Sequence, residues 1–180
     1  MDIRTIKLLD KCEAMSLLCS KASSHWSFVK FLFQIPLILT SSIMCILNSF
    51  ESETTKNMKI PNVVVNGCSV LILSLQNQLK VAEKVELFKT LSNQHLLLAH
   101  SIEALEPDKI TRDIINNMTE KYDALQQQCL FEDIPMRYKK EVVNSWDGRA
   151  LPLQLNGASG IKRHSNNVLK SSIEISTDMV

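Results

Sequence analysis

Glycine is scarce in this chain of 180 residues, which holds only four glycines. Three of them, Gly148, Gly157 and Gly160, fall in the C-terminal part of the chain. The sequence therefore contains no GxGxxG, GxxxxGK[ST] or GxSxG motif, the loops that cradle a nucleotide phosphate or present a nucleophilic serine. This absence excludes the common phosphate-loop and serine-hydrolase chemistries.

The residue spacings that metal and acid–base chemistry need are also missing. The five cysteines never form a CxxC pair, so we expect reduced, apolar cysteines in a non-oxidising compartment. No HExxH motif is present, and His95 and His100 are separated by about 140° around a helix, which prevents them from sharing one metal. We expect a non-enzymatic protein with no metal and no cofactor.

Basic charge is not in excess either. The chain has 20 lysines and arginines against 19 aspartates and glutamates, a formal net charge of +1. A protein that binds duplex nucleic acid usually carries a basic stripe that neutralises phosphates. We therefore expect no nucleic-acid partner.

Charge is absent altogether from two windows, residues 31–50 and 60–79, which contain no Asp, Glu, Lys, Arg or His. Twenty helical residues span about 30 Å, the thickness of the hydrocarbon core of a bilayer. The windows predict a transmembrane hairpin of two spans joined by a polar turn, residues 51–59, with the lipid bilayer as partner. The second window is diluted by asparagine, serine and glutamine, so a buried helix of a soluble bundle is the alternative for it.

The first 30 residues predict an amphipathic helix that leads into the first window. Apolar or small residues recur every three or four positions: Leu8, Cys12, Met15, Cys19, Ala22 and Trp26. No glycine or proline interrupts this pattern before the window, inside which Pro36 can kink the helix. One long helix that enters a membrane is the simplest interpretation.

Residues 80–146 predict a cytosolic helical region. No breaker follows the second window, which opens at Pro61, so its helix is expected to continue to about Leu105. A coiled-coil-like spacing marks an apolar face that we expect to mediate self-association in a homo-oligomer. Its residues are Val81, Val85, Phe88, His95, Ala99 and Ile102.

Prolines divide the rest of the chain. Pro107 predicts the start of another helix, and the step Ile134-Pro135 predicts a second break before a short amphipathic helix. From residue 147 the chain is rich in glycine, serine and asparagine, so residues 147–180 are expected to form a flexible tail. The predicted fold class is thus all-α: a transmembrane hairpin, long cytosolic helices and a disordered tail.

The positive charges that flank the two windows predict the orientation. Among the lysines and arginines near the windows, five precede the first window (Arg4, Lys7, Lys11, Lys21 and Lys30) and three follow the second (Lys80, Lys84 and Lys89), whereas the turn holds two, Lys56 and Lys59. Because positive flanks stay on the cytoplasmic side, both termini are expected to be cytoplasmic. The membrane would be a host membrane, or a virion membrane if the protein is viral.

Each window also carries one uncharged polar stripe. In the first window the stripe is Gln34, Ser41 and Asn48, and in the second it is Asn62, Asn66, Ser69 and Gln76. Small and amide side chains let membrane helices approach and form hydrogen bonds, so the stripes predict a hairpin whose polar faces meet. The alternative is that several hairpins assemble around a pore lined by one stripe, which would make the protein a pore-forming effector.

The order of these elements resembles the SLATT family of two-transmembrane proteins over about residues 10–146. The resemblance lies in Ala-Ser-Ser-His-Trp at 22–26 before the first window, and in residues 88–102, from Phe88 to His95 and Ile102, after the second. Versions carried by giant DNA viruses similarly have an Ile-Pro step after the last long helix, which is Ile134-Pro135 in this chain. The resemblance implies an all-helical, self-associating membrane protein without catalytic residues, and bacterial relatives look like membrane-permeabilising defence effectors.

Overall fold

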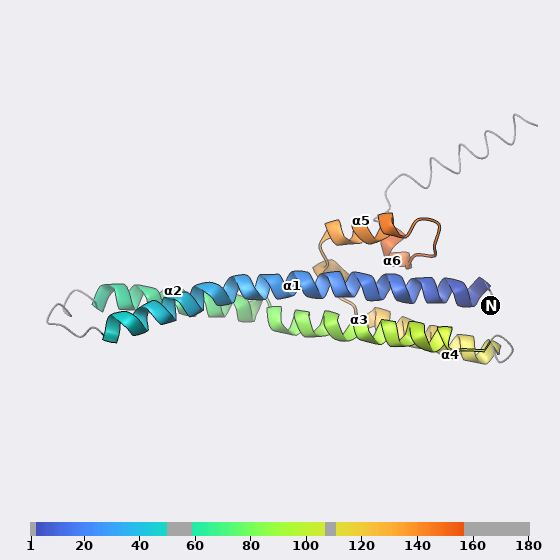
Figure 1. The fold of residues 1–180 in the computed structure, drawn as a ribbon, viewed down its shortest axis with the longest axis horizontal. Coiled ribbons are helices and arrows are strands. Elements are labelled where there is room, and N and C mark those ends of the chain that lie inside the picture. Colours follow the sequence, from blue (N-terminus) through green and yellow to red (C-terminus); the bar gives the residue numbers. More distant parts are fainter. Residues whose placement is uncertain (1–2, 50–58, 107–110, 157–180) are drawn as a thin grey trace, which may run out of the picture. The chain divides into compact units, whose positions relative to one another are not determined.

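The computed structural model describes residues 3–49, 59–106 and 111–156. All secondary-structure elements in these residues are helices. No strand occurs among these residues, which confirms the all-α fold class. The elements, in chain order, are α1 (Ile3–Ser49), α2 (Lys59–Gln78), α3 (Val81–Glu103), α4 (Arg112–Gln128), the 3₁₀ turn η3 (Phe131–Asp133), α5 (Met136–Ser145) and α6 (Leu153–Asn156) (Figure 1).

Helix α1 is a single helix of 47 residues. It joins the amphipathic N-terminal segment to the first charge-free window without a break, as the sequence predicts. Pro36 lies inside it, three residues before Leu39. The predicted stripe of the N-terminal segment is buried at Leu8, Cys12, Met15, Cys19 and Ala22. The 3.6-residue periodicity therefore identified the covered face of this helix correctly.

The helix is interrupted between α2 and α3, where the sequence predicts one continuous helix. Lys80 has a φ of 50°, in the left-handed region, and its backbone N–H donates to the carbonyl of Asn77 over 3.1 Å. The regular helix resumes at once, because the N–H of Lys84 donates to the Lys80 carbonyl over 3.0 Å. No glycine or proline marks this break, so breaker residues gave no warning of it.

The C-terminal segment also differs from its prediction. Residues 147–156 are part of the packed structure: Leu151 and Leu155 are buried, and Leu155 lies in the short helix α6. The predicted flexible tail is therefore wrong for this stretch, and its remainder, residues 157–180, lies outside the described residues. The short helix after Ile134-Pro135 is confirmed as α5, which begins directly after Pro135.

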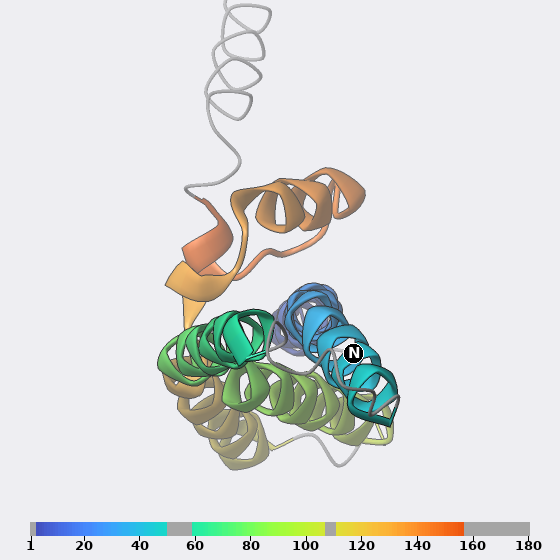
Figure 2. The ribbon, with the colours of Figure 1, turned by 90° about the vertical axis from the view of Figure 1, so that its left-hand side faces the viewer.

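The described residues form two compact units. One, here called the helical body, combines the residues up to Ala22 with those from Lys89 onward, and the other is Ser23–Phe88. Within the helical body, the first part of α1 lies between α3 and α4 on one side and α5 and α6 on the other (Figures 1 and 2). Being covered on two sides explains why α1 buries Ala14 and Leu18 in addition to the predicted stripe.

The left-handed Lys80 yields a stability prediction. A side chain at positive φ costs about 1 kcal/mol, which glycine avoids, so Lys80→Gly is expected to raise the free energy of unfolding by about 0.5 kcal/mol. The matched control is Lys89→Gly, an exposed position inside α3, which is expected to lower it by about 1 kcal/mol. Thermal unfolding in detergent measures both, and equal destabilisation by the two changes would contradict the strained turn.

Candidate functional site

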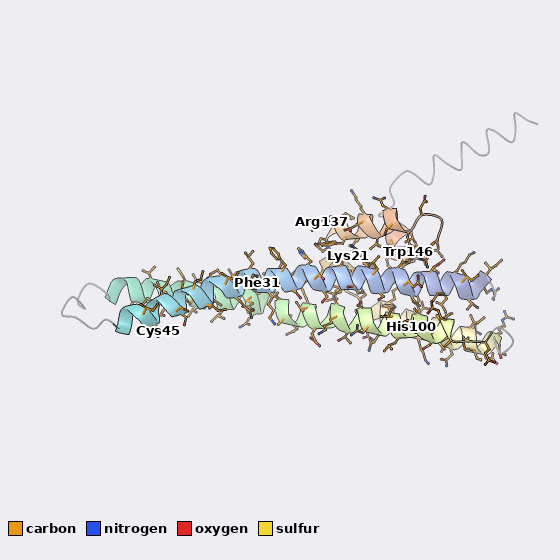
Figure 3. The ribbon with its side chains drawn as sticks, in the orientation of Figure 1. Lys21, Phe31, Cys45, His100, Arg137 and Trp146 are labelled. Carbon is orange, nitrogen blue, oxygen red and sulfur yellow. The ribbon has the colours of Figure 1, made fainter. Side chains whose placement is uncertain are left out.

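The second part of α1 presents an apolar surface that the described residues do not bury. Within the described residues, α1 is the one helix long and apolar enough to cross a membrane, and none of its most apolar 18-residue window is buried. Phe31 is 58% exposed and Leu39 is 56% exposed (Figure 3 labels Phe31 and Cys45 in this segment). Exposed apolar surface of this extent marks a contact with lipid or protein.

Helix α2 is also largely exposed but less apolar. Its described side chains expose Val63, Val64, Val70, Leu71, Leu73 and Leu75. Polar residues such as Gln76 interrupt this surface, and α2 does not reach the length and composition of a spanning helix that α1 reaches. The second span thus stays a prediction.

The polar stripes of the two helices occupy different kinds of surface. On α2, Ser69 and Gln76 are half-buried and share a face with the half-buried Val65 and Ile72. On α1, however, Gln34 and Ser41 are exposed. The structure differs here from the expected pair of facing stripes.

The exposure of Gln34 and Ser41 follows from helix geometry. Successive side chains are rotated by about 100° around a helix, so neighbouring residues lie on different faces. Within residues 31–46 of α1 the half-buried positions are Phe33, Ile35, Leu37, Thr40 and Met44, none of which belongs to the polar stripe. Asn66 of the second stripe is exposed, whereas Asn48 and Asn62 lie outside the residues whose side chains are described.

Several hydroxyl groups in the apolar segments are satisfied by their own helix. Thr40 Oγ1 donates to the Pro36 carbonyl over 2.8 Å, and Ser42 Oγ donates to the Ile38 carbonyl over 2.8 Å. In α2, Ser69 Oγ donates to the Val65 carbonyl over 2.9 Å. Such bonds let a hydroxyl group sit in a medium without water, because no donor is left unpaired.

An aromatic and basic contact lies at the ends of both apolar windows. The Lys84 ammonium lies 4.4 Å from the centre of the Trp26 ring, and His25 packs edge-on against the same ring at 5.7 Å. Ser23 Oγ donates to the Val85 carbonyl over 3.3 Å. These contacts fix α1 against the start of α3 through a cation–π interaction and a hydrogen bond.

The face of α3 that was expected to mediate self-association is covered by the chain itself. Five of its six residues are buried, namely Val81, Phe88, His95, Ala99 and Ile102, and Val85 is half-buried. In the helical body, α3 contacts both α1 and α4, which accounts for the breadth of its apolar face. Self-association stays a prediction, and it would have to use other residues, such as the exposed Leu96 and Leu97.

Two serines join α1 and α3 inside the helical body. Ser16 Oγ donates to the Ser92 carbonyl over 3.0 Å, and Ser92 Oγ donates to the Ser16 carbonyl over 2.9 Å. The reciprocal bonds bring the two backbones close together and satisfy both hydroxyl groups. They fix the register of α1 against α3 one turn before His95.

His95 is a buried polar side chain of this core, and it has no hydrogen bond to the described residues. Its side chain is fully buried, and neither ring nitrogen has a partner among the described residues. The ring packs edge-on against Tyr122 of α4, with the ring centres 5.6 Å apart. Burial lowers the pKa of His95 to about 4, so the imidazole is neutral at pH 7.

The cysteines of the helical body are buried as well. Burial raises the pKa of Cys12 to about 12. A hydrogen bond to the Cys129 thiol, and then burial, raises the pKa of Cys19. Because the thiolate is the reactive form, Cys12 and Cys19 are poor nucleophiles and act as apolar packing residues.

Arg149 attaches the C-terminal segment to α1. Its Nε donates to Asp10 Oδ1 over 2.8 Å, a second guanidinium nitrogen bonds to Glu13, and the Ala150 N–H donates to Asp10 Oδ2 over 3.1 Å. The guanidinium also lies 4.3 Å from the centre of the Trp146 ring. Gly148, at a φ of 78°, provides the turn between Trp146 and Arg149 that glycine adopts without strain.

The sequence did not predict this attachment of Arg149 to Asp10 and Glu13. The available signal was the run from Trp146 to Arg149, in which an aromatic residue, a glycine and an arginine follow one another closely. That run does not indicate which carboxylates Arg149 contacts, because they lie more than 130 positions earlier in the sequence.

The described residues hold no cluster of three or more histidine, cysteine, aspartate or glutamate side chains that could bind a metal ion. No family model, curated protein or solved structure matches the chain.

The Arg149 attachment can be tested directly. Arg149→Ala removes an interaction with two carboxylates, one of them the buried Asp10, so it is expected to destabilise the C-terminal segment by about 1 to 2 kcal/mol. Hydrogen exchange of residues 146–156 is the measurement, and faster exchange confined to this segment is expected. The control is Lys21→Ala, which breaks one largely solvent-exposed ion pair with Glu141 and should change exchange little.

Proposed function

We propose that the protein is a non-enzymatic integral membrane protein whose helical body is a cytosolic platform for protein association. The observation that carries the proposal is the uncovered apolar window of α1. A helix in the core of a soluble protein buries such a window, whereas a bilayer covers it with hydrocarbon. We assign the membrane span to this part of α1.

We further propose that α2 crosses the same membrane as the second span of a hairpin. The contact between Trp26 and Lys84 supports this, because it places α1 and the start of α3 at one level. The first charge-free window begins five residues after Trp26, and the second ends five residues before Lys84. Equal intervals along two helices let both windows end in the same interfacial plane, about 8 Å from the contact.

The residues at this level suit a membrane interface. Tryptophan is enriched where the hydrocarbon meets the headgroups, and lysines stay on the cytoplasmic side. Lys30, Lys80 and Lys84 all lie near the proposed plane, which supports cytoplasmic termini and a cytoplasmic helical body. The resemblance to the SLATT family, in the form carried by giant DNA viruses, is compatible with this topology and with self-association.

The membrane span makes a prediction about one charged substitution. Leu39 lies near the middle of the first window, and a lysine there costs about 3 kcal/mol in a spanning helix. After expression in cells, the unchanged chain is expected to stay in the membrane pellet through alkaline carbonate extraction, and Leu39→Lys is expected to shift a large fraction into the supernatant.

Ile6→Lys is the matched control, because it places the same charge at an exposed apolar position of the same helix, outside the window. It is expected to leave extraction unchanged. Release of the unchanged chain by carbonate would overturn the proposed membrane function.

A further inference from the structure

His95 combines three features that are rarely found together in a helix core. It is fully buried, neither ring nitrogen has a partner among the described residues, and it lies where α1, α3 and α4 meet. A buried polar group without a hydrogen bond destabilises the folded state, and its presence calls for an explanation. An alternative apolar residue at this position would pack without that cost.

Among the described residues, a tyrosine, a cysteine and two serines lie around His95, and the Asp123 carboxylate also acts on that tyrosine, Tyr122. Tyr122 faces it from α4, and the α1 thiol of Cys12 acts on Tyr122, which places that thiol near the same site. Ser92 and its partner Ser16 lie one turn away. Burial lowers the pKa of His95, and no charged group among the described residues contributes to this shift.

We propose that His95 is a pH-sensitive latch of the helical body: proton uptake by its ring at acidic pH opens the packing of α1, α3 and α4. A protonated imidazole is a cation with two N–H donors, and the buried site offers it neither an acceptor nor a counter-charge. Opening lets the ring reach water. It also uncovers the apolar face of α3 around Leu91, Leu98 and Ile102, which is buried in the closed body.

The direction of the pH effect follows from proton linkage. The pKa of His95 is about 4 in the closed body and 6.5, its ordinary value, when the ring is in water. The open form therefore binds more protons as pH falls below about 6.5, and closure loses stability until about pH 4, below which both forms are protonated. These two values favour the open form on the order of 20-fold more at pH 5 than at pH 7.

The buried thiols provide a readout of opening. In a Cys45→Ser, Cys68→Ser background the remaining cysteines are Cys12, Cys19 and Cys129, which are buried in the helical body. Their reaction with 4,4′-dithiodipyridine, which modifies thiols in acid, is followed in detergent from pH 7 to pH 5. Each rate is divided by the rate of the denatured chain at the same pH, which removes the pH dependence of the thiols themselves.

The normalised rate is expected to rise about 20-fold between pH 7 and pH 5 in the protein with His95. It is expected to stay flat in His95→Leu and in His95→Gln, an apolar and a polar replacement that cannot titrate. His100→Gln, a change of the exposed histidine of the same helix, should retain the rise. A flat rate with His95 present, or an equal rise in both His95 variants, would overturn the latch, and neither result depends on membrane insertion.

Discussion

The uninterrupted α1 helix is the constraint on which the rest of the structure depends. Its first part is covered on two sides, by α3 and α4 and by the C-terminal segment, whereas none of its later apolar window is buried by the described residues. Exposure of apolar surface to water is unfavourable in both parts of this helix. The same continuous backbone therefore requires a protein environment for one part and an apolar, non-protein or intermolecular environment for the other.

Serine and threonine hydroxyl groups form different hydrogen bonds in the apolar window and in the helical body. In the apolar window, Thr40 and Ser42 turn their hydroxyl groups back to carbonyls of their own helix, which removes the need for water. In the helical body, Ser16 and Ser92 instead use their hydroxyl groups to join two helices. In the apolar window the hydroxyl group thus bonds within its own helix, whereas in the helical body it fixes the register of two neighbouring helices.

Periodicity in the sequence was enough to predict the helical class, the covered stripe of α1 and the division at Pro135, because each depends on local spacing. It was insufficient at Lys80, where a left-handed turn occurs without glycine, and at Arg149, whose partners Asp10 and Glu13 are far away in sequence. It also left the partner of the α3 face open. A wide apolar face indicates that something covers it, but spacing does not distinguish another molecule from α1 and α4 of the same chain.

His95 shows why that distinction matters. As part of a self-association face, an exposed histidine would remain hydrated in the monomer and would titrate near its ordinary pKa. Because α1 and α4 cover the face, the same residue is dehydrated, neutral and without a hydrogen bond, and its pKa falls to about 4. On a self-association face His95 would affect association between chains. Because it is packed inside the helical body, it instead opposes closure of that body in acid. Closure of the helical body and access to the apolar face of α3 are then linked to one proton.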